Sequence, residues 1–232
     1  MSVREVKNEL IRLANPEKAA VLARFFKTGK DQYSEGDLFL GVMVPQQRAT
    51  ARKFRDLSLK DIAGLLSDKA HECRLTALLI LVDKYGRAGE KDREEIFRFY
   101  LDSTNRINNW DLVDLSAPKI VGEYLLERDK SALYDLARSE LLWERRIAII
   151  STFAFIRKGR FADTLALAEI LINDRHDLIH KAVGWMLREV GKKDRAAEEV
   201  FLRKHCRRMP RTMLRYATEK FDEAGRKRYA AK

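Results

Sequence analysis

Apolar residues recur at spacings of three and four along most of the 232-residue chain, which is the pattern of an α-helix with one buried face. The clearest helices are predicted at residues 74–85, 143–157 and 178–190. Each is followed by a glycine of the kind that ends helices, namely Gly86, Gly159 and Gly191. No stretch alternates apolar and polar residues as a half-buried strand does. The chain is therefore predicted to be all-α, with short connections between antiparallel helices.

Two helix starts are marked by capping residues. Asn15 lies directly before Pro16, so an N-cap residue precedes a proline at the first helical position and predicts a helix through about residue 27. Ser58 is followed three positions later by Asp61, which resembles a capping box with aspartate in place of the usual glutamate. Residues 29–44 are the least regular part of the chain and are predicted to form a loop.

The organisation predicted from these elements is a single domain of residues 1–232. An N-terminal helical pair occupies about residues 1–30, and helical repeats occupy about residues 46–220. No linker rich in Gly, Ser or Pro separates two parts of the chain.

An internal period of 35 residues, the separation of Arg146 and Lys181, brings several segments into register. A period of this length is typical of stacked helical hairpins in an α-solenoid. Equivalent positions of successive repeats then lie side by side along one wall of the stack. Two tryptophans, an aspartate and an arginine fall within about one helical turn of a common line. They are Trp110, Asp114, Arg146 and Trp185.

The composition excludes two classes of protein. Apolar residues make up 46% of the chain, which is too many for a disordered protein, and the negative mean hydropathy excludes a membrane protein. Cys73 and Cys206 lie far apart, which favours a reduced, intracellular protein over a disulfide framework. No secretory signal is readable at the N-terminus, so a cytoplasmic location is expected.

The charge is biased towards basic residues. Lysine and arginine number 46 against 35 acidic residues, and the resulting net charge of +11 favours nucleic acid as a partner over an anionic membrane. Arg48 and Arg52 lie at helical spacing. Lys158 and the pair Lys192 and Lys193 follow two predicted repeat helices at related places in the period, so they are expected to form a ladder that follows a phosphate backbone. The alternative is a solvated edge that binds nothing.

Trp110 and Asp114 are four positions apart and share one helix face. Taken alone, they fit a core tryptophan and an aspartate at the rim that caps a neighbouring helix. The repeat register places Arg146 and Trp185 beside them, and two indoles that flank a carboxylate can hold a cation. Arg146 can neutralise a phosphate or orient the carboxylate, or it can form a salt bridge between repeats with Asp111.

The sequence does not indicate other chemistry. Trp143 is expected to pack in the core or within a helical hairpin. His71 and Cys73, like His176 and His180, lack the ligand spacing of a zinc site, so no metal is expected. The chain has no Gly-rich phosphate loop and no Ser, His and Asp set, so no cofactor is expected either.

Five segments together carry a family resemblance. They are Asn15-Pro16-Glu17-Lys18-Ala19, Phe39-Leu40-Gly41-Val42-x-Val44-Pro45-x-x-Arg48, Trp110-Asp111-Leu112-Val113-Asp114, Trp143-x-x-Arg146 and Lys181-Ala182-x-Gly184-Trp185-x-Leu187-Arg188-Glu189. Over about residues 12–195 the chain resembles the AlkD-type DNA alkylation repair proteins. Those proteins are DNA glycosylases built from HEAT-like repeats that remove alkylated purines. The segments around the first and last tryptophans are the most specific.

The resemblance implies a right-handed α-solenoid of HEAT-like repeats with a concave basic face. By position, Asp114 looks like the catalytic aspartate of the family. Trp110 and Trp185 look like its two sugar-contacting indoles, and Arg146 looks like its phosphate-binding arginine. Lys181 is expected to bind DNA with the basic residues named above. Two positions depart from the family pattern, both with consequences for substrate range. Phe25 replaces a tyrosine, and Asn109 stands where a second tryptophan can precede the first.

Alkylation at N3 or N7 gives a purine a positive charge and makes it a good leaving group, so one carboxylate suffices where glycoside hydrolases usually need two. No lysine is placed as a Schiff-base nucleophile. The expected activity is that of a monofunctional glycosylase, a monomer in the cytoplasm and on the nucleoid, which excises 3-methyladenine or 7-methylguanine from duplex DNA in base excision repair. The main alternative is a catalytically inactive HEAT-like DNA-binding module. A protein–protein scaffold would leave the basic ladder unexplained.

Overall fold

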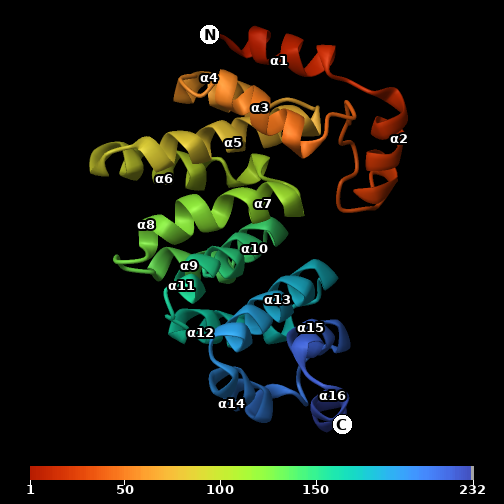
Figure 1. Ribbon diagram of the computed structural model, residues 1–232, viewed down its shortest axis with the longest axis vertical. Helices are drawn as coiled ribbons and strands as arrows, with labels where there is room; N and C mark the ends of the chain where they lie inside the picture. The colour runs from red at the N-terminus through yellow and green to blue at the C-terminus, as the bar shows by residue number, and fades with distance from the viewer. Residues whose placement is uncertain (231–232) are drawn as a thin grey trace. The chain divides into compact units, whose positions relative to one another are not determined.

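The computed structural model describes residues 1–230, and this part of the chain is helical (Figure 1). Its only extended pairing is an isolated parallel bridge between Leu38 and Ala70. The prediction of an all-α fold is confirmed. Within residues 1–230, no helix combines the length and apolar character needed to cross a membrane.

The chain divides into two compact units, Met1–Ser116 and Ala117–Lys232, and each is described by itself. Whether the two form the single domain expected from the sequence stays a prediction. The helices of the first unit are α1 (Val3–Arg12), α2 (Pro16–Phe25), α3 (Val44–Lys53), α4 (Leu59–Leu66), α5 (His71–Arg87), α6 (Glu90–Asp102), η1 (Thr104–Arg106) and α7 (Trp110–Ala117).

Helix α5 is the centre of the first unit. Its residues from His71 to Leu81 are all buried, and it packs against α1, α3, α4 and α6. Figure 1 shows these helices following one another from α1 through α3 and α4 to α5 and α6. Because α5 is enclosed on all sides, the polar residues in its first turn must find partners inside the protein.

Both predicted capping signals of this unit are confirmed. The Oδ1 atom of Asn15 accepts a hydrogen bond of 2.9 Å from the backbone N–H of Lys18 at the start of α2. The Oγ atom of Ser58 accepts one of 3.1 Å from the N–H of Asp61 at the start of α4. Each side chain satisfies a backbone donor that the helix itself cannot pair.

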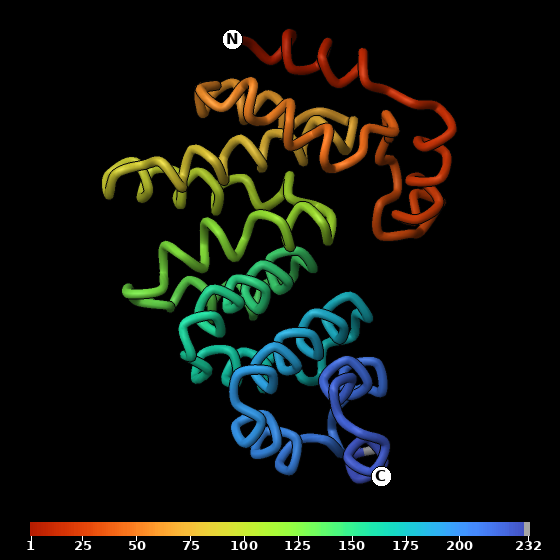
Figure 2. Tube along the Cα trace, in the orientation of Figure 1, coloured from red at the N-terminus to blue at the C-terminus, as the bar shows by residue number. Residues whose placement is uncertain are grey.

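The loop predicted at residues 29–44 is also confirmed, except that its last residue begins α3. Figure 2 shows it as an irregular trace beside α2. Gly41 has a φ of +80°, and a Cβ atom there would collide with the carbonyl of Asn15 and lie 2.7 Å from the N–H of Ala19. The absence of a side chain therefore lets the end of the loop lie directly on the first turn of α2.

The second unit is helical as well. Its elements are η2 (Pro118–Gly122), α8 (Glu123–Leu125), α9 (Ser131–Ala137), α10 (Leu142–Ser151), α11 (Phe153–Arg157), α12 (Ala162–Ile170), η3 (Leu171–Asn173), α13 (Asp177–Lys193), α14 (Arg195–His205), α15 (Arg211–Ala217), η4 (Thr218–Lys220) and α16 (Glu223–Ala230). Helix α13 packs against α10, α14 and α15. Arg146 on α10 and Lys181 on α13 are one sequence period apart, so the period does place equivalent helices side by side within this unit.

The helix predicted at residues 143–157 is interrupted. Thr152 separates α10 from α11, and its hydroxyl donates a hydrogen bond of 2.7 Å to the carbonyl of Ile149. The preceding Ser151 hydroxyl donates one of 2.6 Å to the carbonyl of Ile147. Two consecutive hydroxyls that bond back to helix carbonyls compete with the helical pattern and bend it.

The helix ends predicted at two glycines are also wrong. Gly86 and Gly191 lie inside α5 and α13, which end at Arg87 and Lys193. A Cβ atom at Gly191 would collide with the carboxylate of Glu198, so this glycine permits close packing between α13 and α14. By contrast Gly159, with a φ of +72°, does follow the end of α11.

Candidate functional site

Trp110 is the first residue of α7 and is half-buried. The side-chain oxygen of Asn109 accepts a hydrogen bond of 2.8 Å from the backbone N–H of Trp110, and this bond fixes the start of the helix. The indole ring stacks on Phe26 with a centroid distance of 5.1 Å and an angle of 10°. Phe25 meets it edge-on at 6.0 Å and is itself 62% exposed. Trp110 thus belongs to an aromatic cluster that reaches the surface.

Asp114 lies one helical turn after Trp110 and is also half-buried. Burial raises the pKa of the nearby Tyr100. The hydrogen bond with Ser116 lowers this pKa in part, and the charge of the Asp114 carboxylate raises it. Tyr100 is fully buried, with its hydroxyl 2.8 Å from Ser116 Oγ. The Asp114 carboxylate therefore lies at the boundary between solvent and the core of the first unit.

A buried histidine lies beneath the start of α7. The Nε2 atom of His71 is 2.8 Å from Oδ2 of Asp111, and its Nδ1 atom is 3.4 Å from Oδ2 of Asp37. The three side chains are at most 8% exposed. Burial alone lowers the pKa of His71, but the hydrogen bonds with Asp111 and Asp37 raise it to about 9. At neutral pH the ring is an imidazolium that donates to both carboxylates.

Two further buried side chains extend this network. Arg74 places Nη2 2.7 Å from Oδ1 of Asp37. Burial acts to raise the pKa of Asp37, but the hydrogen bond with His71 and the charge of Arg74 hold it below its usual range. Asn109 donates a hydrogen bond of 2.6 Å to the hydroxyl of Ser34 in the same loop. The loop and the start of α7 are therefore fastened to each other and to α5.

The end of the loop is held by Glu72. Its carboxylate accepts hydrogen bonds from the consecutive N–H groups of Leu40, Gly41 and Val42, the shortest being 2.8 Å. Three backbone donors directed at one buried carboxylate satisfy its charge without a basic partner. This arrangement explains why a glutamate can be the second residue of the buried helix α5.

A small cavity of about 50 Å³ lies against these groups. Phe26, Phe39, His71 and Asp111 contribute to its wall. It has room for a few water molecules. It is too small to enclose a purine.

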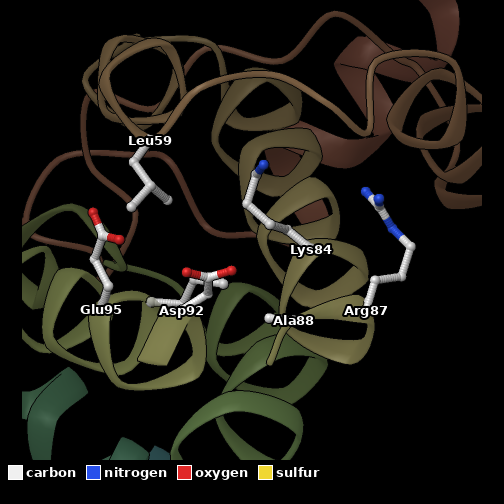
Figure 3. A pocket seen from close by; sticks show the side chains of 7 residues that line it. Leu59, Lys84, Arg87, Ala88, Asp92 and Glu95 are labelled. Carbon is white, nitrogen blue, oxygen red and sulfur yellow. The ribbon is translucent and has the colours of Figure 1, made fainter. Parts of the chain in front are cut away.

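A larger cavity of about 370 Å³ lies among α4, α5 and α6 and shares no residue with this wall (Figure 3). Lys84, Asp92 and Glu95 line it, whereas the guanidinium of Arg87 is directed away from the two acidic side chains. Arg87 instead pairs with Asp83, at 2.9 Å. The mixture of both charge signs around this cavity does not favour a polyanion.

In the second unit, Trp185 lies on α13 and is half-buried. Its Nε1–H donates a hydrogen bond of 3.1 Å to Oε1 of Glu189, one turn later. The same carboxylate atom is 2.7 Å from the amine of Lys192. Gly184, the preceding residue, allows α15 to approach, because a Cβ atom there would collide with a backbone carbonyl and lie 2.6 Å from Cβ of Tyr216. The indole is therefore fixed by a carboxylate on its own helix.

Arg146 is only 5% exposed. Its Nη1 atom donates a hydrogen bond of 2.6 Å to the carbonyl of Leu178 at the start of α13. This contact joins α10 to α13 within the second unit, so the side chain has a structural role there. Asp111, named above as a possible salt-bridge partner, hydrogen-bonds His71 in the first unit.

The remaining predicted DNA-binding residues lie on helices or helix ends. Arg48, which is half-buried, and the exposed Arg52 share one face of α3 in the first unit. In the second unit, Lys158 caps α11, while Lys192 and Lys193 form the last turn of α13. All three lysines are exposed. The amine of the fourth, Lys181, is 2.7 Å from a carboxylate oxygen of Asp177.

The profile of the DNA alkylation repair enzyme family matches residues 6–221. The chain belongs to this family. Two solved structures are similar to it in fold. One, from Enterococcus faecalis and named a predicted DNA alkylation repair enzyme, has a TM-score of 0.70 and 17% identity, covering 90% of this chain and 97% of its own. The other, smu.31 from Streptococcus mutans UA159, has a TM-score of 0.54 and 18% identity, covering 89% and 98%. No curated protein matches the sequence.

For this member of the DNA alkylation repair enzyme family, sequence reasoning selected the two half-buried tryptophans but missed the groups that hold them. The sequence presents His71 only as a possible metal ligand, and it indicates no role for Asp37 or Glu189. One signal is available: His71, Glu72 and Arg74 open an apolar helix, and polar groups buried in this way need partners. Among residues 1–230, no group of three His, Cys, Asp or Glu side chains is placed to hold a metal ion.

Proposed function

We propose that this DNA alkylation repair protein is a monofunctional DNA glycosylase. It hydrolyses the N-glycosidic bond of positively charged alkylated purines, of the 3-methyladenine and 7-methylguanine type, in base excision repair. The observation that carries the proposal is the face of α7, where the half-buried Asp114 carboxylate lies one turn from the indole of Trp110. A negative charge and an aromatic face at the surface suit a cationic transition state.

The reaction follows from the charge of the substrate. Breaking the glycosidic bond moves the electron pair to the alkylated base, which leaves neutral, and an oxocarbenium-like charge develops on the sugar. Asp114 stabilises that charge and orients the attacking water, while Trp110, one turn away on the same helix, contacts the deoxyribose. Trp185 is likewise proposed to contact a sugar of the DNA. No second carboxylic acid is required, because the leaving base needs no proton.

The small size of the cavity lined by Phe26 and Asp111 favours a lesion that stays outside the protein. At about 50 Å³, this space does not accept a base turned out of the duplex. The neighbouring Phe25 is 62% exposed and offers only hydrocarbon at this position. We expect it to contribute apolar contact with the substrate and no hydrogen bond.

Duplex DNA is the proposed partner, bound by a monomer in the cytoplasm and on the nucleoid. The net charge of +11 supports this partner. The proposed phosphate contacts are Arg48, Arg52, Arg146, Lys158, Lys181, Lys192 and Lys193. A second candidate function, a DNA-binding module without catalysis, is favoured by the exposed Lys158, Lys192 and Lys193, because binding phosphates requires no catalytic group.

The experiment measures release of 7-methylguanine and 3-methyladenine from methylated duplex DNA by the wild-type protein, by Asp114→Asn and by Asp135→Asn. Asp135 is an exposed carboxylate on α9 and serves as the matched control. We expect a loss of about 100-fold or more for Asp114→Asn, as for other groups that stabilise a transition-state charge, and no change for the control. DNA binding without any release by the folded wild type would establish the second candidate function instead.

A further inference from the structure

The start of α7 is fastened by charges that lie out of reach of solvent. His71 lies between Asp111 on α7 and Asp37 in the loop, and Arg74 pairs with Asp37 from the same helix as His71. With the imidazolium present, two positive and two negative charges balance. A neutral ring would leave one buried negative charge uncompensated, which is costly in a protein interior.

The same histidine is part of the aromatic cluster. Its ring stacks on Phe39 at 4.7 Å and packs against Phe26 at 4.9 Å. Phe26 in turn stacks on Trp110 at 5.1 Å. His71 therefore reaches Trp110 by two routes, through the ring of Phe26 and through the helix start that Asp111 belongs to.

We infer that His71 is a positioning residue, which acts through Asp111 and Phe26 to hold Trp110 and Asp114 in place for the reaction. The inference rests on the glycosylase function proposed above. His71 touches no substrate in this scheme. Its effect is to keep α7 in one position, because small displacements of reacting groups reduce the rate strongly.

A purely structural histidine would give different results. Loss of such a residue lowers the stability of the protein but leaves the rate unchanged in the molecules that remain folded. A positioning residue changes the rate of the chemical step at saturating enzyme while the affinity for DNA stays the same. Replacing a positioning residue also changes the environment of Trp110, and this change can be measured whether or not the protein has activity.

The variant His71→Phe separates these cases because it keeps a ring against Phe26 and removes both hydrogen bonds. The matched control is His205→Gln on α14, since His205 is also buried, at 3% exposed, and also packs against a phenylalanine. Single-turnover release of 7-methylguanine and the dissociation constant for DNA are measured for each. We expect the rate to fall about tenfold or more for His71→Phe, with DNA affinity within about twofold and the control unchanged.

The pH profile provides a second measurement. The groups that face His71 are Asp37 from the loop, Asp111 from α7 and Arg74 from its own helix. The pKa of His71 is about 9, so the wild-type rate is expected to fall as the pH rises through about 9. His71→Phe should lack this decrease. A wild-type rate that stays level through this range overturns the inference, as does an unchanged rate for His71→Phe.

A measurement without substrate separates this inference from the function on which it rests. Of the three tryptophans, replacing Trp143 and Trp185 with phenylalanine leaves Trp110 as the only indole. We expect His71→Phe in this background to increase acrylamide quenching of Trp110 about twofold, from the greater exposure of a loosened ring. If the wild type releases no base, the proposed function fails, and unchanged quenching then also refutes positioning by His71. If His71→Phe does not fold, Asp111→Asn, which keeps one acceptor, replaces it with the same expected outcomes.

Discussion

Glu198 provides a prediction about stability that can be worked out from the structure. Its side chain lies on α14 at 2% exposure, packed against Gly191 of α13, and its Oε1 atom has no hydrogen-bond partner among residues 1–230. Burial raises the pKa of Glu198 to about 8, despite the opposing charge of Arg195. The carboxyl group is therefore largely protonated in the folded protein at neutral pH but ionised in the unfolded chain.

The sign of the effect follows from this difference. A carboxyl group whose pKa is higher in the folded state binds its proton more tightly there, so its contribution is intact below pH 4.5 and is lost as the pH rises to about 8. With about 1.4 kcal/mol for each tenfold change in proton affinity, the cost at pH 7 is about 3 kcal/mol. For a protein of this size, 1 kcal/mol corresponds to about 2–4 °C in the melting temperature.

The variant Glu198→Gln removes the ionisation and keeps the shape. We expect its melting temperature to exceed that of the wild type by about 6–12 °C at pH 7 and to equal it at pH 4.5. The assay is thermal unfolding followed by circular dichroism between pH 4.5 and 8. The control is Glu140→Gln, which changes an exposed glutamate in the same unit and should follow the wild type throughout. Parallel curves for Glu198→Gln and the wild type would refute the reasoning, because buried ionisation would then cost nothing.

Two further predictions concern the segment around Trp185. Gly184→Ala should lower the free energy of unfolding by about 1–3 kcal/mol in chemical denaturation, because its Cβ atom would crowd Tyr216, and unchanged stability would contradict the close packing of α15. Glu189→Ala removes the acceptor of the Trp185 indole and should reduce 7-methylguanine release about tenfold, a cost typical of a hydrogen bond to a charged group. The matched control for the second is Glu219→Ala, and equal release by both variants would show that the indole needs no anchor.

Much of the fold could be predicted from the sequence because local signals determine it. Asn15 and Ser58 cap helices through their own side chains, and Gly159 ends one through its own backbone conformation. The 35-residue period likewise requires only that equivalent helices be neighbours, as α10 and α13 are. Features of this kind depend on residues a few positions apart, so the pattern along the chain contains them.

The errors in the fold arose where individual side-chain contacts decide the local structure. Gly191 is a residue type that often ends helices, yet α13 continues past it. The glycine is there because the Glu198 side chain of the next helix occupies the space that a Cβ atom would need. The break at Thr152 depends on the hydrogen bond that its hydroxyl donates to the carbonyl of Ile149. Apolar periodicity gives no information about whether a helix continues at Gly191 or breaks at Thr152, because either residue can occur inside a helix or at its end.

The candidate site shows the same limit. The sequence offers Asp111 as one possible partner of Arg146, but in the first unit Asp111 hydrogen-bonds His71, which is 40 positions away. Asp37, the second partner of His71, lies in a loop that has no periodic pattern at all. A buried ionic network is specified by the fold as a whole, so only the requirement for partners, and not their identity, could be predicted.

Trp110 and Trp185 are both half-buried, and each is linked to a charged side chain, Trp110 through Phe26 and Trp185 directly. Trp110 stacks on Phe26, which packs against the imidazolium of His71. Trp185 donates its N–H to the carboxylate of Glu189. A ring fixed in advance loses little freedom when it contacts a sugar, and its face is already in place as positive charge develops. Because neither His71 nor Glu189 is a proposed phosphate contact, changing them should slow the reaction of bound DNA, whereas affinity for DNA should depend on the exposed lysines and arginines.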